Sequence, residues 1–285
     1  MYKLILEDEL HNQIVFNELG GAFQITDIQG LNPPSADINT NDVALIDGQT
    51  FNSAKLQMRT INLAFAIDYE AERARMEVYR TVHSKKPIRL YYQSEYRDVY
   101  IDGYVQAVDI SYFEMKQICT VSILCPQPYL KAAQEMIDEV TAVVPMFHFP
   151  FASTADPELV FSVFDATSHK LIENDSGIDT GMVIEWQAIF QVTNPKLYNF
   201  DTGEFIGLNM SLQKGDKVTI STAPGNKTVT LLRNGVESNI FNALMKGSTW
   251  LELRPGINDF YMEIRTGNLT NITTTIKYQL NYEGV

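Results

Sequence analysis

The sequence predicts a mainly β protein, a β-rich α+β chain, with two domains joined by a proline-rich linker. Most apolar runs alternate with a period of two. In Leu56–Ile67 (LQMRTINLAFAI) one alternating set is wholly apolar from Ile61 onward, which is typical of a half-buried strand. Only residues 68–86 have apolar side chains at helical spacing. After about residue 159, short apolar runs alternate with turn signals such as Asn234-Gly235, a pattern typical of a β-sandwich.

The first half of the chain predicts strands on both sides of a single helix. The strands expected before the helix are Tyr2–Leu6, Ile14–Phe16 and Ile25–Ile28. A proline pair, Pro33 and Pro34, then begins a polar loop that continues through Asn41. Asp68 can cap the helix, and Pro87 must end it because proline has no amide hydrogen to donate. The strands expected after the helix are Ile88–Tyr92, Arg97–Val108 and Ile118–Cys125.

The hexapeptide CPQPYL, residues 125–130, marks the end of the first domain. Pro126 and Pro128 remove two donors from a β ladder, so the strand must stop there. Cys119 and Cys125 lie on one side of that strand but about 20 Å apart, whereas a disulfide needs Cα atoms about 4.4–6.8 Å apart. We therefore expect two buried free thiols. The predicted boundaries are residues 1–135 for the first domain, 136–157 for the linker and 158–285 for the second domain.

The charge balance argues against binding to nucleic acids. The chain has 22 Lys and Arg against 35 Asp and Glu, for a net charge of −13, and it has no basic stripe that could grip phosphates. No run of 18 apolar residues is present to cross a bilayer, and the short apolar start is too brief for a signal peptide. Catalytic, phosphate-loop and metal-binding motifs are also missing. We therefore expect a protein that is not an enzyme, binds no cofactor or metal and does not insert into membranes.

Four segments, taken in order, resemble the distal tail proteins (Dit) of siphophages. Residues 47–67 contain the family's Asp-Gly followed by a strand with an arginine, and residues 88–130 form a Tyr-rich hairpin ending in Cys-Pro-x-Pro-Tyr. Gln127 and Leu130 depart from the Asp and Phe that many relatives have there. The remaining two segments, residues 194–229 and 253–264, resemble strands of the family's C-terminal galectin-like sandwich.

The resemblance implies a structural protein that forms a homo-hexameric ring at the distal end of the tail tube. Its N-terminal domain, a split-barrel-like β-sandwich with one helix, would build the ring, and its galectin-like domain would project outward. The implied partners are the tail tube protein, the tail-associated hub protein and baseplate or receptor-binding proteins at the sides. DNA would only pass through the lumen, where an acidic wall would repel phosphates. The protein would be made in the cytoplasm of the host bacterium and would reside in the virion.

The polar segment after the proline pair is the candidate ring interface. Long polar loops inside compact domains are usually functional, often as binding segments. The candidate interface residues are Pro33, Pro34, Asp37, Asn39 and Asn41.

Two other functions stay open at this point. The second domain could bind carbohydrate at the tail tip, because aromatic side chains can stack on sugars; the candidates are Trp186, Tyr198 and Trp250. Burial of both tryptophans in the sandwich core is the simpler interpretation. Alternatively, the chain could be the equivalent ring component of a phage-tail-like bacteriocin, which would share the fold.

Overall fold

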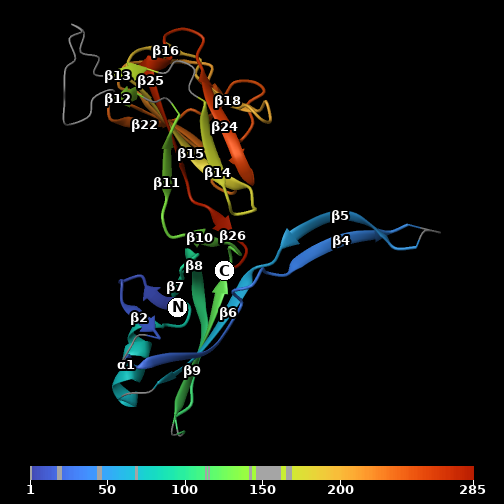
Figure 1. Ribbon diagram of the computed structural model, residues 1–285, viewed down its shortest axis with the longest axis vertical. Coiled ribbons are helices and arrows are strands. Elements are labelled where there is room, and N and C mark those ends of the chain that lie inside the picture. The colour runs from blue at the N-terminus through green and yellow to red at the C-terminus, as the bar shows by residue number, and fades with distance from the viewer. Residues whose placement is uncertain are drawn as a thin grey trace, which may run out of the picture. The chain divides into compact units, whose positions relative to one another are not determined.

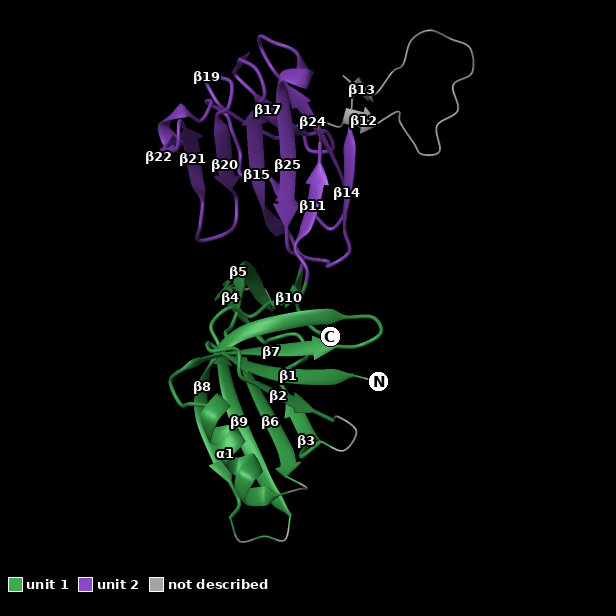
Figure 2. Ribbon diagram, turned by 90° about the vertical axis from the view of Figure 1, so that its left-hand side faces the viewer, with its two compact units in different colours: residues 1–133, 281–285 green, residues 134–280 purple. Residues whose placement is uncertain are grey.

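The computed structural model divides the chain into two compact units (Figures 1 and 2). It describes residues 2–17, 21–43, 47–67, 70–112, 114, 116–140, 143–145, 162–164 and 169–285. Unit 1 contains Met1–Ala133 together with Asn281–Val285, and unit 2 contains Gln134–Leu280. The chain therefore passes from one unit to the other twice. Within the described ranges, no helix is long and apolar enough to span a membrane.

Unit 1 is built on one curled antiparallel sheet with the strand order β2-β1-β7-β8-β9-β6-β3. Two short strands extend it, because β10 pairs with both β8 and β26. The strands are β1 (Lys3–Asp8), β2 (Gln13–Phe16), β3 (Phe23–Gln29), β6 (Arg59–Ile67), β7 (Pro87–Gln93), β8 (Asp98–Ile110), β9 (Gln117–Cys125), β10 (Leu130–Ala132) and β26 (Asn281–Tyr282).

The sheet curls until its two ends approach each other without closing a barrel. The amide of Asn17, just after β2, donates to the carbonyl oxygen of Phe23 in β3 at 3.0 Å. Phe16, Phe23 and Phe65 meet inside the curl, with ring centroids 4.9–6.2 Å apart. Edge-to-face aromatic contacts at such distances add to the stabilisation from burial. One alternate set of residues in β6 and β9, which includes Ile61, Leu63, Val121 and Ile123, is buried, as predicted.

One helix, α1 (Ala71–Thr81), packs on the sheet through Ala74, Val78 and Thr81. The helix is shorter than predicted. Its N-cap position is Glu70, which makes no side-chain capping bond, and Asp68 lies outside the described residues. The chain leaves the helix at Val82, five residues before Pro87, because Val82 is already extended.

Unit 2 is a sandwich of two antiparallel sheets. The larger sheet has the order β11-β25-β15-β20-β21-β22, with β23 beside β15, and the smaller has the order β14-β24-β17-β18. The larger sheet consists of β11 (Met136–Glu139), β25 (Ile272–Tyr278), β15 (Thr180–Ala188), β20 (Lys217–Ser221), β21 (Thr228–Arg233), β22 (Val236–Asn239) and β23 (Glu252–Leu253). The smaller sheet consists of β14 (Lys170–Asn174), β24 (Gly256–Glu263), β17 (Lys196–Asn199) and β18 (Phe205–Gly207).

The core of unit 2 lies between these sheets, where each contributes its buried alternate residues. Ile184, Trp186 and Ile276 come from the larger sheet, and Leu197 and Phe260 come from the smaller; all are fully buried. Short elements complete the unit: β12 (Val143–Pro145) pairs with β13 (Ser162–Phe164), β16 (Val192–Thr193) pairs with β19 (Ser211–Leu212), and two 3-10 turns cover Phe241–Ala243 and Leu269–Asn271.

The predicted fold class is confirmed: the protein is mainly β, with one helix among the described residues of unit 1 and a sandwich in unit 2. Two details differ from the predicted boundaries. Residues 136–139, expected in the linker, form β11 and pair with β25. Residues 281–285, expected in the second domain, return to unit 1, where β26 pairs with β10. A two-residue strand has too short a pattern to show which sheet it joins.

Candidate functional site

The most unusual feature of unit 1 is a hairpin that projects away from the curled sheet (Figure 1). It consists of β4 (Ala36–Asp42) and β5 (Gln49–Leu56), and we call these residues the arm. Every arm residue is exposed except Thr40 and Leu56, which are half-buried. The prediction of a polar loop was wrong here, since the segment forms two paired strands. The loop was predicted because the segment is mostly polar. In the structure the two strands pair, so every second side chain lies on the same face.

One face of the arm is apolar. Ala36 pairs with Leu56, and Ile38 pairs with Ala54. A bulge between the pairs of Asn39 and Thr40 shifts the register, so that Phe51 lies opposite Thr40 and joins this same face. Ile38 is 65% exposed and Phe51 is 63% exposed. An isolated two-stranded hairpin is marginal in water, so a projecting hairpin with an uncovered apolar face is suited to binding a partner.

The opposite face of the arm is polar. Asp37 accepts a hydrogen bond from the Gln57 amide at 2.5 Å and lies 3.9 Å from the Lys55 ammonium. Asn39, which pairs with Ser53, lies on the same face. Of the candidate interface residues, Asp37, Asn39 and Asn41 lie on this polar face, whereas Pro33 and Pro34 precede β4 at the base of the arm. Sequence reasoning missed the apolar face, although Ile38 and Phe51 stand out in a polar stretch.

A buried arginine holds the base of the arm. Arg59, the first residue of β6, is only 3% exposed. Its Nη1 donates to the carbonyl oxygens of Gly30 (2.7 Å) and Asn32 (3.0 Å), just before the arm. Its Nε donates to the Pro128 carbonyl at 2.8 Å, and its Nη2 donates to the Glu283 carbonyl at 2.5 Å. One planar guanidinium thus binds three segments of the chain. We call this arrangement the Arg59 anchor.

Burial lowers the pKa of Arg59 from its ordinary value, while the nearby carboxylate of Glu283 opposes that shift. An arginine remains charged even when its pKa is lowered, because its ordinary pKa is above 12. The cost of burying this charge is offset by four charge-assisted hydrogen bonds. The backbone of Gly30 also lies very close to that of Thr60. A Cβ on Gly30, whose φ is +92°, would lie 2.2 Å from the Thr60 carbonyl oxygen.

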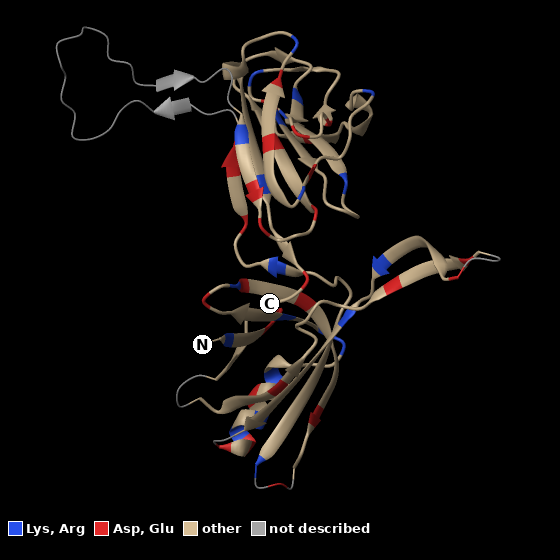
Figure 3. Ribbon diagram, turned by 45° about the vertical axis from the view of Figure 1, so that its right-hand side comes forward, with Lys and Arg blue, Asp and Glu red and all other residues tan. Residues whose placement is uncertain are grey.

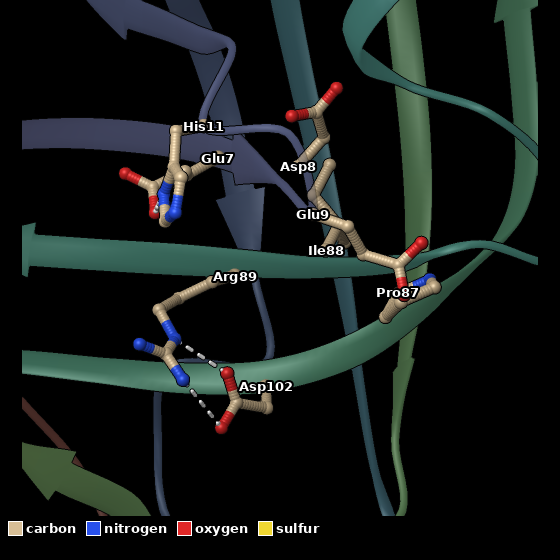
Figure 4. Close-up of a pocket in the computed structure, with 8 residues that line it drawn as sticks. All are labelled: Glu7, Asp8, Glu9, His11, Pro87, Ile88, Arg89 and Asp102. Atoms are coloured by element: carbon tan, nitrogen blue, oxygen red, sulfur yellow. Dashed lines mark hydrogen bonds and ion pairs between the residues drawn. The ribbon is translucent and has the colours of Figure 1, made fainter.

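Unit 1 also has a pocket of about 330 Å³ that is lined partly by carboxylates (Figure 4). Three of these carboxylates already accept hydrogen bonds from neighbouring groups of the chain. Asp102 accepts two hydrogen bonds from Arg89, at 2.6 and 3.2 Å. Asp8 accepts from the amides of Leu10 and Asn12 and so holds a turn. A hydrogen bond from Gln13 is the main cause of the lowered pKa of Glu7. Throughout the described residues, no three His, Cys, Asp or Glu side chains are grouped to hold a metal ion.

The two cysteines are confirmed as buried free thiols. Cys119 and Cys125 are fully buried in β9 and form no disulfide. Burial raises the pKa of each thiol to about 12. A thiol with such a pKa is almost entirely protonated near neutral pH and therefore a poor nucleophile.

The candidate sugar-stacking residues do not form a common site. Trp186 is fully buried in the sandwich core, as the simpler interpretation expected, so it cannot stack on a sugar. Trp250 packs against Phe241 at 5.7 Å, and the Lys227 ammonium lies 5.5 Å from its ring centroid. Trp250 therefore has local partners within unit 2, although it is half-buried rather than buried in the core as expected.

Tyr198 belongs to a row of aromatic side chains across the smaller sheet. Its ring stacks on Tyr261 at 5.1 Å with only 7° between the planes, and Phe205 lies 5.2 Å away on the other neighbouring strand. His169 continues the row beyond Tyr261. Since neighbours on both sides cover the faces of Tyr198, the row resembles cross-strand packing more than an open stacking platform.

Acidic and basic residues are interspersed along the strands of both units (Figure 3). Many are paired within the chain: Glu185, for example, lies 3.1 Å from the Lys217 ammonium and 3.0 Å from the Lys277 ammonium. No catalytic arrangement emerges from the described residues. The arm, with its Arg59 anchor, is the feature of the described residues best suited to binding a partner.

Comparisons with known proteins agree with this architecture. Residues 12–125 match the phage tail protein RIFT-related domain, and residues 175–282 match the C-terminal domain of the siphovirus-type tail component. No curated protein sequence matches the chain. The crystal structure of Dit from phage SPP1, described as a paradigm of hub adsorption apparatus in phages infecting Gram-positive bacteria, matches with a TM-score of 0.66 and 13% identity over 99% of both chains. A chain of the phage p2 baseplate in its activated conformation matches with a TM-score of 0.51 and 13% identity over the whole of both chains.

The two family models lie in order along the chain and fall in units 1 and 2, respectively. The proteins named in these comparisons are structural components of tails and baseplates. A siphophage tail component of this kind resides in the virion, at the distal end of the tail. Together, the two family models and the fold shared with SPP1 Dit support a siphophage distal tail (Dit) protein.

Proposed function

We propose that this protein assembles into a ring of six, in which the arm of each subunit binds the next subunit. The observation that carries the proposal is the arm's apolar face. Fully burying a large apolar side chain stabilises a complex by about 1.5–3 kcal/mol. Ile38 and Phe51, each more than 60% exposed, are therefore the arm residues that should contribute most to a contact between neighbouring subunits.

The next subunit is the partner that we favour for the arm. An arm that binds a neighbouring copy makes a head-to-tail contact, and repeated head-to-tail contacts close into a ring when the rotation allows it. The ring would join the tail tube to the hub protein and carry baseplate or receptor-binding proteins at its sides. These partners, and the number six, are what the resemblance to the Dit family implies.

The outward face of β6 and β9 is a suitable lining for a lumen that DNA crosses. Thr60, Asn62 and Thr120 are exposed there, and Ser122 is half-exposed. Neither strand presents an exposed Lys or Arg, since Arg59 is buried in the anchor. A polar wall without cations would let phosphates pass without binding them.

The proposal is tested by measuring mass in solution and imaging the particles by electron microscopy. We expect six-fold rings from the unaltered protein. Ile38→Ser together with Phe51→Ser should abolish them and leave a folded monomer. Ile257→Ser is the matched control, because Ile257 is 66% exposed but lies in unit 2. Rings that persist in the arm variant would remove the arm's role, and a protein that never forms rings, even with its hub partner, would overturn the proposed assembly.

A further inference from the structure

We infer that Arg59 positions the arm by tying its base to residues 281–285, so that assembly depends on a segment that follows unit 2 in the sequence. This inference rests on the proposed function for its consequence in assembly. The positioning itself concerns a single chain and can be tested without a ring.

The first step is the geometry of the anchor. Among the hydrogen bonds that the structure describes, only the Arg59 side chain joins the base of the arm to residues 281–285. It donates to the carbonyl oxygens of Gly30 and Asn32 at the base and to the carbonyl oxygen of Glu283. The guanidinium is planar and rigid, so its donors fix their acceptors relative to one another. If the Glu283 carbonyl moves, Arg59 no longer holds the carbonyls of Gly30 and Asn32 in a fixed position relative to residues 281–285.

The second step is direct packing between the same two segments. A Cβ built on Gly284 would lie 3.1 Å from Pro33 Cδ and 3.4 Å from the Leu31 carbonyl oxygen. The chain beside Glu283 therefore lies against the residues that lead into the arm. Pro33 was a candidate interface residue; its place here suggests that it directs the arm.

The third step is that residues 281–285 are themselves held firmly in unit 1. Asn281 and Tyr282 pair with Lys131 and Leu130 in β10. Tyr282 is only 8% exposed, and the Arg97 guanidinium lies 4.0 Å from the centroid of its ring. A cation over an aromatic face at this distance is attractive. The segment can thus act as a fixed support for the arm.

The alternative is that Arg59 only stabilises the core of unit 1. That role would lower the melting temperature of an Arg59 variant without changing the direction of the arm. A positioning role predicts a broader range of arm directions, even in a variant that stays folded. If the competent direction is then populated about a tenth of the time, the apparent affinity for the next subunit falls about tenfold.

The test measures the distance between spin labels on Ser53→Cys, in the arm, and Glu72→Cys, on α1; both positions are exposed. Cys119 and Cys125 are buried and should not react. Labelled protein is diluted into unlabelled protein, so that only distances within one chain are seen. Three perturbed chains are compared: Arg59→Lys, Gly284→Val and a chain that ends at Leu280. Val285→Ala is the control, because Val285 is 43% exposed.

We expect one narrow distance distribution for the unaltered chain and for Val285→Ala, and broad distributions for Arg59→Lys and Gly284→Val, with weaker assembly. The Gly284 variant keeps the inference testable if the shortened chain fails to fold. Narrow distributions with an unchanged mean in Arg59→Lys and Gly284→Val, or a broad one in the unaltered chain, would overturn it. Broadening in a protein that never forms rings would support the positioning role and refute only the proposed ring.

Discussion

Two antiparallel strand pairs in unit 1 share a sequence pattern but have opposite environments. In β6–β9, alternate residues such as Ile61, Leu63 and Phe65 are fully buried. In the arm, alternate residues also share an apolar face, yet Ile38 and Phe51 remain exposed. The period-two pattern thus marks a face that needs to be buried. It does not say whether the covering surface belongs to the same chain or to a partner.

Because the two strand pairs differ in burial, they should contribute to different free energies: β6–β9 to that of unfolding, and the arm to that of association. Residues of β6–β9 are buried in the single chain, so substitutions there should act on the free energy of unfolding. The arm is held by its base and by the Arg59 anchor and buries little surface itself. Substitutions on the arm should therefore leave the monomer nearly unchanged and act on association.

The largest expected effect is that of Phe65→Ala on the free energy of unfolding. Phe65 is fully buried and touches Phe16 and Phe23, with ring centroids 4.9 and 5.7 Å away. We expect a loss of about 3–5 kcal/mol, typical of removing a buried phenylalanine, in urea unfolding followed by circular dichroism. Phe51→Ala is the matched control and should stay within about 0.5 kcal/mol, as exposed positions usually do. Equal losses in both would mean that the arm folds back onto a core.

A buried ion pair in unit 2 extends the comparison to charged groups. Asp216 has a side chain only 3% exposed and accepts two hydrogen bonds from Arg233. The hydrogen bond from Arg233 is the main cause of the lowered pKa of Asp216. A lowered pKa means that the pair stabilises the folded state above the ordinary pKa of 3.8, and this stabilisation is lost as the pH falls through the lower folded value.

Asp216→Asn should therefore cost about 1.5–3 kcal/mol near neutral pH, the usual worth of hydrogen bonds to charged groups. Its melting temperature should approach that of the unaltered protein as the pH falls below about 4. Asp37→Asn is the control: its partner Lys55 is 80% exposed and 3.9 Å away, and exposed pairs are worth about 0–1 kcal/mol. A gap between Asp216→Asn and the unaltered protein that stays constant with pH would argue against the ion pair as its source.

Cys119→Ser tests the β6–β9 pair with a smaller change. Cys119 is fully buried and lies opposite Phe65 in the ladder. A serine there places a hydroxyl in an apolar site, so we expect a loss of about 1–3 kcal/mol. A reducing agent should not change the melting temperature of the unaltered protein, because both thiols are free. A clear drop with reductant would indicate a disulfide between chains.

Sequence reasoning predicted the parts of the molecule that depend on local pattern. The mainly β class, the single helix and the strand that ends at Cys125 all follow from periodicity and proline chemistry. The return of Asn281–Tyr282 to unit 1 could not be predicted, because it depends on contacts with residues about 150 positions away, such as Leu130. Arg59 was visible as an arginine at the start of a strand. Its role was not, because all four of its acceptors are backbone carbonyls, which any sequence supplies.

The smallest expected effect concerns the polar face of the arm, which the sequence suggested as the ring interface. Asn39→Ala with Asn41→Ala should leave the melting temperature unchanged, because both residues are exposed. A polar group that exchanges water for a partner gains only about 0.5–1.5 kcal/mol, so assembly should weaken by less than about tenfold per residue. Ile38→Ser with Phe51→Ser removes two apolar contacts and should weaken assembly far more. If the asparagine variant had the larger effect on the assembly midpoint in a dilution series, the polar face would be the interface, and the apolar face would need another partner.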